Sequence, residues 1–207
     1  MGCDIHMHVE YKRTINNIKK WICGDYFKVN PYYNSKCVYE EPFELVDFCD
    51  DRNYDLFAIL ANVRNYGETD YMSNPRGLPD DVTKEVQAEA ERWGEDGHSH
   101  SYITLKELLD FQKNIKPLKQ QGMISPKEQK ALDEKGTLPS MWCQGTNMEG
   151  WAWRKWEMEN TVLLPLIESL KRRADELGVI YDIQWERDYE KAYKRSEDIR
   201  IVFWFDN

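Results

Sequence analysis

All four histidines of the 207-residue chain fall in two His-x-His pairs, and this spacing is the main chemical signal in the sequence. The first pair is His6 and His8, and the second is His98 and His100. In an extended strand, residues two apart point to the same side, so both imidazoles of a pair lie within reach of one metal ion or of two adjacent ions. Each pair is therefore a candidate metal-binding unit.

Carboxylates accompany the first pair at the same period-two spacing. Asp4 and Glu10 extend it to an Asp-x-His-x-His-x-Glu strip. Two carboxylates with two imidazoles are typical ligands of zinc, manganese and non-haem iron in hydrolases. The sequence therefore predicts a divalent metal, of one of these three kinds, held by both pairs. The predicted ligands are Asp4, His6, His8, His98 and His100.

The second pair lies in the segment GEDGHSHS at 94–101, where two glycines allow the backbone to approach a ligand closely. If the two pairs converge, Glu10 or Asp96 is placed to orient or deprotonate a metal-bound water. Each pair also has a simpler interpretation. The first is then the polar outer face of an antiparallel strand, and the second a helix-capping loop with Ser101 or Thr104 as the cap.

Arg52, Arg64 and Arg76 follow capping or glycine-rich segments and are candidate phosphate ligands, because a guanidinium binds phosphate through two hydrogen bonds. The alternative is that they form surface ion pairs in an acidic protein. Four of the eight tryptophans lie within 139–156. They are suited to stacking on a nucleobase or to packing in the core.

Charge narrows the range of partners. The chain has 28 Lys and Arg against 37 Asp and Glu, a net charge of -9. This balance argues against a protein that coats duplex nucleic acid, because Lys and Arg supply most of the affinity for phosphates there. A small phosphorylated or nucleotide ligand remains open, as does the oligomeric state. Five cysteines without a CxxC motif, and the lack of a leader-like or membrane-spanning apolar stretch, predict a cytoplasmic protein with reduced thiols and no membrane partner.

Hydrophobic periodicity predicts a single α+β domain over 1–207, with a mixed or antiparallel sheet that includes the N- and C-terminal strands and in which these two strands can be neighbours. Extended segments are expected at 2–10, 21–29, 36–48, Val179–Trp185 and Asp198–Phe205. Helices are expected behind Asp50–Asp51, from Asp80 or Asp81 to Gly94, within 103–112, in an exposed excursion at 115–136, and between Asn160 and Gly178. The segments 65–82 and 139–156 are expected to be loops.

Well-known catalytic signatures are missing from the sequence. It has no P-loop, GxGxxG, GxSxG or HExxH motif, and no paired His-x-Ser/Thr motif of the two-histidine phosphoesterases. Asp-x-His-x-His resembles the opening strand motif of the polymerase-and-histidinol-phosphatase class of metal phosphoesterases. That class needs more histidines further along the chain than are present here.

Five segments together resemble an uncharacterised family found largely in bacteriophages and prophages. They are GCDIH, RNYDLFAILANVR, PRGLPDDV, GHSHS and RIVFWFDN, and they span nearly the whole chain. The resemblance implies a phage protein made in the host cytoplasm, and it implies no particular activity.

The sequence thus favours a metal-dependent hydrolase, most simply a phosphoesterase acting on a nucleotide or a small phosphorylated ligand in the infected host. Two alternatives need no metal. One is a non-catalytic sponge that sequesters a nucleotide signal of host defence. The other is an inhibitor that blocks a host enzyme with its acidic surface.

Overall fold

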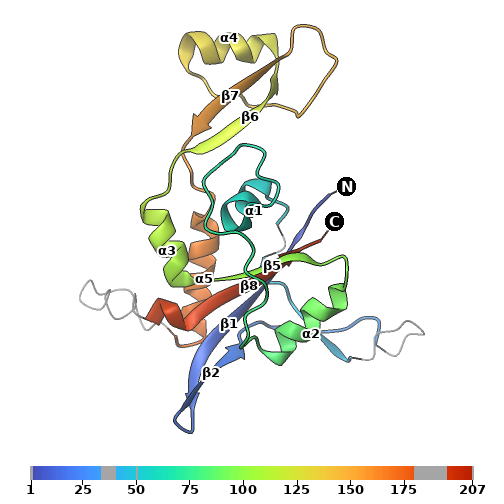
Figure 1. Cartoon of the computed structure of the whole chain (residues 1–207), viewed down its shortest axis with the longest axis vertical. Helices are drawn as coiled ribbons and strands as arrows, with labels where there is room; N and C mark the ends of the chain where they lie inside the picture. Colours follow the sequence, from blue (N-terminus) through green and yellow to red (C-terminus); the bar gives the residue numbers. More distant parts are fainter. Residues whose placement is uncertain (1, 34–40, 50, 180–194, 207) are drawn as a thin grey trace.

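A four-stranded antiparallel sheet forms the centre of the protein (Figure 1). The computed structural model describes residues 2–33, 41–49, 51–179 and 195–206. The strands stand in the order β2-β1-β8-β5. They comprise Ile18–Cys23, Ile5–Ile15, Ile199–Phe205 and His98–Thr104, respectively. The expected α+β fold is confirmed, and the predicted pairing of the first and last strands forms the middle of the sheet.

Helices cover the two faces of the sheet unequally. Helices α1 (Tyr54–Ala61), α3 (Leu105–Lys113) and α5 (Leu164–Glu176) pack on the larger apolar core. On the other face, helix α2 (Lys84–Trp93) packs through two buried side chains against β8. The period-two alternation of β1 and β8 decides which side chains meet each layer. Residues of β1 that face the larger core are Cys3, Ile5, Met7 and Val9.

A smaller unit projects from this body at the top of Figure 1. It consists of the hairpin β6 (Leu118–Ile124) and β7 (Ala152–Met158) with helix α4 (Pro126–Lys135). The prediction of a helix throughout 115–136 was therefore wrong for its first half. The prediction of a loop at 139–156 was wrong for its last residues. Both segments satisfy their backbone groups by pairing with each other, a long-range effect that local propensity does not contain.

The N-termini of two helices differ from expectation. Asn53, and neither Asp50 nor Asp51, accepts the capping hydrogen bond of α1 from Leu56. Helix α2 begins after Thr83, beyond Asp80 and Asp81. Thr104, one of the two caps named in the alternative interpretation of the second histidine pair, caps α3 in a capping box with Glu107.

The remaining described elements are the short ribbon β3 (Phe27–Val29) and β4 (Phe43–Leu45) and the 3₁₀ turn η2 (Ser196–Asp198). Most of the predicted strand Val179–Trp185 lies outside the described residues. Within the described ranges, none of the helices has the length and apolar character needed to cross a membrane.

Candidate functional site

The pairing of β1 with β8 positions the first histidine pair. His6 stands opposite Trp204, and His8 stands opposite Val202. Because Ile5 and Met7 face the larger core, both imidazoles point to the opposite face, towards α2. The prediction of a strand with both imidazoles on one face is confirmed.

His8 is held by a buried carboxylate. Its Nδ1 lies 2.8 Å from Asp25 Oδ2, and both side chains are 1% exposed. The other oxygen of Asp25 accepts a hydrogen bond from the backbone N–H of Val9 at 3.0 Å, which fixes the carboxylate. His8 Nε2 is buried and has no hydrogen-bond partner in the described part of the chain. It lies 3.4 Å from Asp47 Oδ1.

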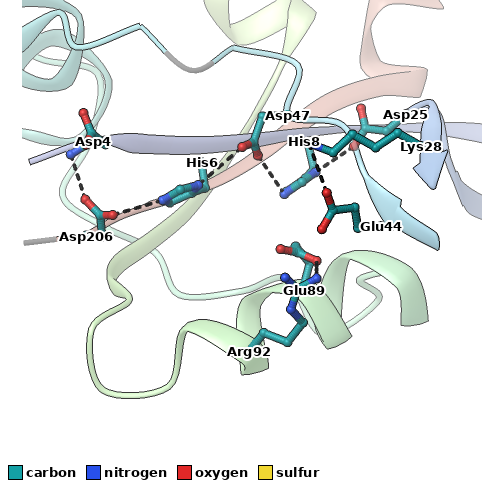
Figure 2. A network of polar contacts seen from close by, with 10 residues as sticks. All are labelled: Asp4, His6, His8, Asp25, Lys28, Glu44, Asp47, Glu89, Arg92 and Asp206. Carbon is teal, nitrogen blue, oxygen red and sulfur yellow. Dashed lines mark hydrogen bonds and ion pairs between the residues drawn. The ribbon is translucent and has the colours of Figure 1, made fainter. Parts of the chain in front are cut away.

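His6 lies between two carboxylates. Its Nδ1 is 3.5 Å from Asp47 Oδ2, and its Nε2 is 3.3 Å from Asp206 Oδ2. Burial lowers the pKa of His6, but the hydrogen bonds and charges of Asp47 and Asp206 outweigh burial and raise it above its ordinary value. Asp47 thus presents one oxygen to each imidazole. Figure 2 shows the resulting row of alternating acids and imidazoles, which runs Asp206, His6, Asp47, His8, Asp25.

This row has three carboxylates for two imidazoles. The cations drawn beside it in Figure 2 are already paired, Lys28 with Glu44 and Arg92 with Glu89. The surplus of negative charge favours an added cation. As they stand, however, no group of three or more His, Cys, Asp or Glu side chains in the described ranges is arranged to hold a metal ion.

The second histidine pair is split by a β-bulge. The register of β5 on β8 shifts between His98 and Ser101, and Ser99 takes a left-handed backbone with φ of 55°. The expectation that both imidazoles of this pair point the same way is therefore wrong. His98 stacks on Phe205 in the larger core, with ring centroids 6.1 Å apart. His100 stacks on Trp204 on the other face, at 5.7 Å.

The indole of Trp204 is the common neighbour of three histidines. Its ring centroid lies 6.0 Å from that of His6, 5.1 Å from that of His8 and 5.7 Å from that of His100. Strand β8 separates β1 from β5, so the indole lies between the first pair and His100. The structure gathers these three imidazoles on one face and leaves His98 on the other.

The carboxylates predicted from the strip have other partners. Glu10 is fully buried, and its oxygens accept hydrogen bonds from Arg200 at 2.7 Å and from the backbone N–H of Thr83 at 2.6 Å. It is therefore a structural residue and does not reach a metal-bound water. Asp4 accepts two hydrogen bonds from Arg52, which lower the pKa of Asp4 despite the opposing effect of desolvation. Asp96 is exposed after α2.

The three candidate phosphate ligands have partners within the chain. Arg52 binds Asp4, Arg64 donates to the Tyr66 hydroxyl at 3.0 Å, and Arg76 donates to Glu107 at 2.7 Å. Arg52 and Arg76 thus form the ion pairs of the alternative interpretation, whereas Arg64 donates to an uncharged hydroxyl. Of the clustered tryptophans, Trp156 is buried, and Trp142 meets it edge-on with centroids 5.5 Å apart.

Sequence reasoning missed the three carboxylates that contact the first pair. Asp206 directly follows the last strand, so the predicted pairing of the first and last strands was a signal for its position beside His6. Asp25 and Asp47 lie in segments expected to be extended, and nothing local distinguishes them from other acidic residues.

No family model, curated protein or solved structure matches the chain. The resemblance to a phage family remains an expectation, and the function is inferred from the geometry of this site.

Proposed function

We propose that the protein is a divalent-metal-dependent hydrolase of phosphoesters, with a metal held by His6, His8 and Asp47. Two imidazoles and one carboxylate are a set found in catalytic zinc and non-haem iron sites, where the remaining positions take water and substrate. This set replaces the ligands predicted from sequence. It keeps the first histidine pair and omits Asp4 and the second pair.

The unpartnered Nε2 of His8 is the observation that supports the proposal most strongly. With the Nδ1 proton directed at Asp25, a neutral ring carries its lone pair on Nε2. In that tautomer a lone pair faces Asp47 Oδ1 at 3.4 Å and is repelled by the carboxylate, a repulsion that a proton or a metal cation between the two atoms removes. A divalent ion removes this conflict and also satisfies the buried nitrogen.

The observed spacings are compatible with ligation. Two ligand atoms on one tetrahedral zinc, each about 2.0–2.1 Å from the ion, stand about 3.3 Å apart. The corresponding distances are 3.4 Å from His8 Nε2 and 3.5 Å from His6 Nδ1 to the oxygens of Asp47. Because the side chain of Asp47 is 34% exposed, we expect it to turn on binding and complete the site.

Each proposed imidazole ligand has a carboxylate on its other nitrogen. Asp25 holds His8, and Asp206 holds His6. Such outer carboxylates fix the tautomer and ring orientation of a metal-binding histidine and raise its basicity. The metal would lower the pKa of a bound water and neutralise a substrate phosphate in this acidic setting. Held by His6, His8 and Asp47, the metal would supply a water that is a better nucleophile toward a phosphoester.

Metal analysis of purified protein, with single histidine variants, tests the proposal. Wild type should bind one or two equivalents of Zn²⁺, Mn²⁺ or Fe²⁺ and hydrolyse bis(p-nitrophenyl) phosphate or a nucleotide phosphoester with it. His8→Ala should lose at least tenfold in metal affinity and in rate. His98→Ala is the matched control, because its ring lies on the other face of the sheet, and it should retain both.

Two results distinguish the alternatives. Wild type without bound metal, and without a rise in Tm on adding these ions, excludes the hydrolase and favours a metal-free sponge or inhibitor. Metal binding without cleavage of any nucleotide offered excludes catalysis while retaining the site.

A further inference from the structure

A polar cavity lies where the projecting unit meets the body, away from the histidine row. Its volume is 170 Å³. Its walls are formed by residues of helix α1, of the loop that follows it, of β6 and of the segment before β7. Its polar and aromatic lining includes Tyr54, Asp55, Tyr66, Gln120, Trp142 and Gln144.

Backbone contacts fix the two sides of this cavity. The backbone N–H of Lys119 in β6 donates to Thr69 Oγ1 at 3.0 Å, and the side-chain amide of Gln121 donates to the backbone carbonyl of Tyr66. The backbones approach so closely at Gly67 that a Cβ there would lie 2.1 Å from the Lys119 carbonyl oxygen. The cavity is therefore built into the fold, and its shape does not depend on exposed side chains alone.

Aromatic rings stand at the cavity with much of their surface open to solvent. Tyr66 is 46% exposed and Trp142 is 40% exposed. Trp142 is supported edge-on by buried Trp156. Rings that are supported from behind and open in front offer a face on which a planar ligand can stack.

A carboxyl group and amides provide the hydrogen-bonding part of the cavity. The Gln120 amide, 9% exposed, donates to Asp55 Oδ1 at 2.7 Å. Burial raises the pKa of Asp55, and the hydrogen bond from Gln120 offsets part of this rise. The Gln144 amide is exposed and has no hydrogen-bond partner among the described residues. Amide and carboxyl groups beside aromatic rings are what proteins use to bind the edge and the faces of a nucleobase.

We propose that this cavity binds the pyrimidine base of a nucleoside or nucleotide, with the ribose directed to solvent. The volume selects the ligand class. An engineered protein cavity of about 150 Å³ accepts benzene, so 170 Å³ holds a single six-membered ring, whereas the second ring of a purine would extend out of this open cavity into solvent. The inference does not depend on the proposed metal site.

Calorimetric titration of the full chain tests this proposal. The probes are uridine, cytidine, adenosine, guanosine and, as a ligand without a base, ribose. A pyrimidine nucleoside should bind at least tenfold more tightly than either purine, and ribose should not bind. Comparing uridine with uridine 5′-monophosphate shows whether the natural ligand carries a phosphate, because Arg64 and Lys119 also line the cavity.

The Gln144→Ala variant separates binding from folding. It should weaken pyrimidine binding at least fivefold while leaving Tm unchanged, because this exposed amide holds no other part of the chain. Gln129→Ala is the matched control, a glutamine of the same unit that donates to backbone carbonyls outside the cavity, and it should bind as wild type does.

Three outcomes would overturn the proposal. They are no binding of any nucleoside at millimolar concentration, equal or tighter binding of purines, and unchanged binding by Gln144→Ala. His8→Ala should bind pyrimidines as wild type does, so failure of the metal site and failure of this cavity are distinguishable.

Discussion

Glu10 and Arg200 form a buried ion pair in which Glu10 Oε2 lies 2.7 Å from both Nε and Nη2 of the guanidinium. They face each other across β1 and β8, one step along the same sheet face from His8. The guanidinium also stacks on Trp21, 3.9 Å from the ring centroid, and binds Asp81 at 2.7 Å. The pair therefore lies beside His8 on the sheet face that carries the candidate site.

Removing one partner of this pair should be costly. Arg200→Met leaves the Glu10 carboxylate buried and uncompensated, which should lower the free energy of unfolding by about 3–5 kcal/mol. Glu10→Gln/Arg200→Met should recover part of this loss. Denaturant melts of both variants measure the effect. Arg76→Met, which breaks a more exposed pair with Glu107, should cost about 1 kcal/mol or less.

The indole of Trp204 should matter for both stability and metal binding. Trp204→Ala removes a fully buried side chain and should cost about 3–5 kcal/mol. It also removes the surface on which His6 and His8 stack, so metal affinity should fall even though no ligand is changed. Thermal melts and metal titration below the melting range measure the two effects. Trp153→Ala, 42% exposed in wild type, should leave metal affinity unaltered.

Asp55 should make stability depend on pH in a direction opposite to most carboxylates. Burial raises its pKa in the folded protein, so the ionised form costs stability, and this cost appears as pH rises through the folded pKa. Asp55→Asn keeps an acceptor for Gln120 and removes the charge. It should raise Tm at pH 7 and lose this advantage below about pH 3, where aspartate is largely protonated in both states.

Asp70→Asn is the matched control for this pH series. The hydrogen bond from Lys116 lowers the pKa of Asp70. Its substitution should therefore not raise Tm at pH 7. An equal gain in Tm from both substitutions would show that net charge, and not burial of Asp55, is responsible.

Gly67→Ala should open the junction between the body and the projecting unit. The added methyl group meets the backbone oxygen of Lys119, which cannot move aside as a flexible side chain can. We expect a loss of about 1–3 kcal/mol in unfolding free energy and weaker pyrimidine binding. Gly145→Ala, where a Cβ meets nothing within 4 Å, should change neither.

The central sheet was predictable because its strands carry strong period-two patterns. Alternate side chains are apolar from Ile5 to Tyr11 in β1 and throughout β8, and a register slip of one residue would move these β1 side chains away from the core. Strand β5 was not predicted, because HSHS has little apolar content and follows a glycine-rich turn. Its strand structure comes from pairing with β8.

The candidate site was predictable only where it depends on the alternation within a single strand. The common face of His6 and His8 follows from their spacing. His98 and His100 point to opposite faces because Ser99 has a left-handed backbone, and a serine at this position does not predict that conformation. Asp25 and Asp47 reach the histidines through tertiary packing between segments, and Asp47 belongs to no strand or helix.

The antiparallel pairing of β1 with β8 also sets the order of events in biosynthesis. Asp206 is made 200 residues after His6, directly after the partner strand β8. Until then β1 lacks its neighbour in the middle of the sheet, and contacts between distant segments form slowly. The row of acids and imidazoles is therefore complete only once β8 has been made and has paired with β1, because Asp206 follows that strand.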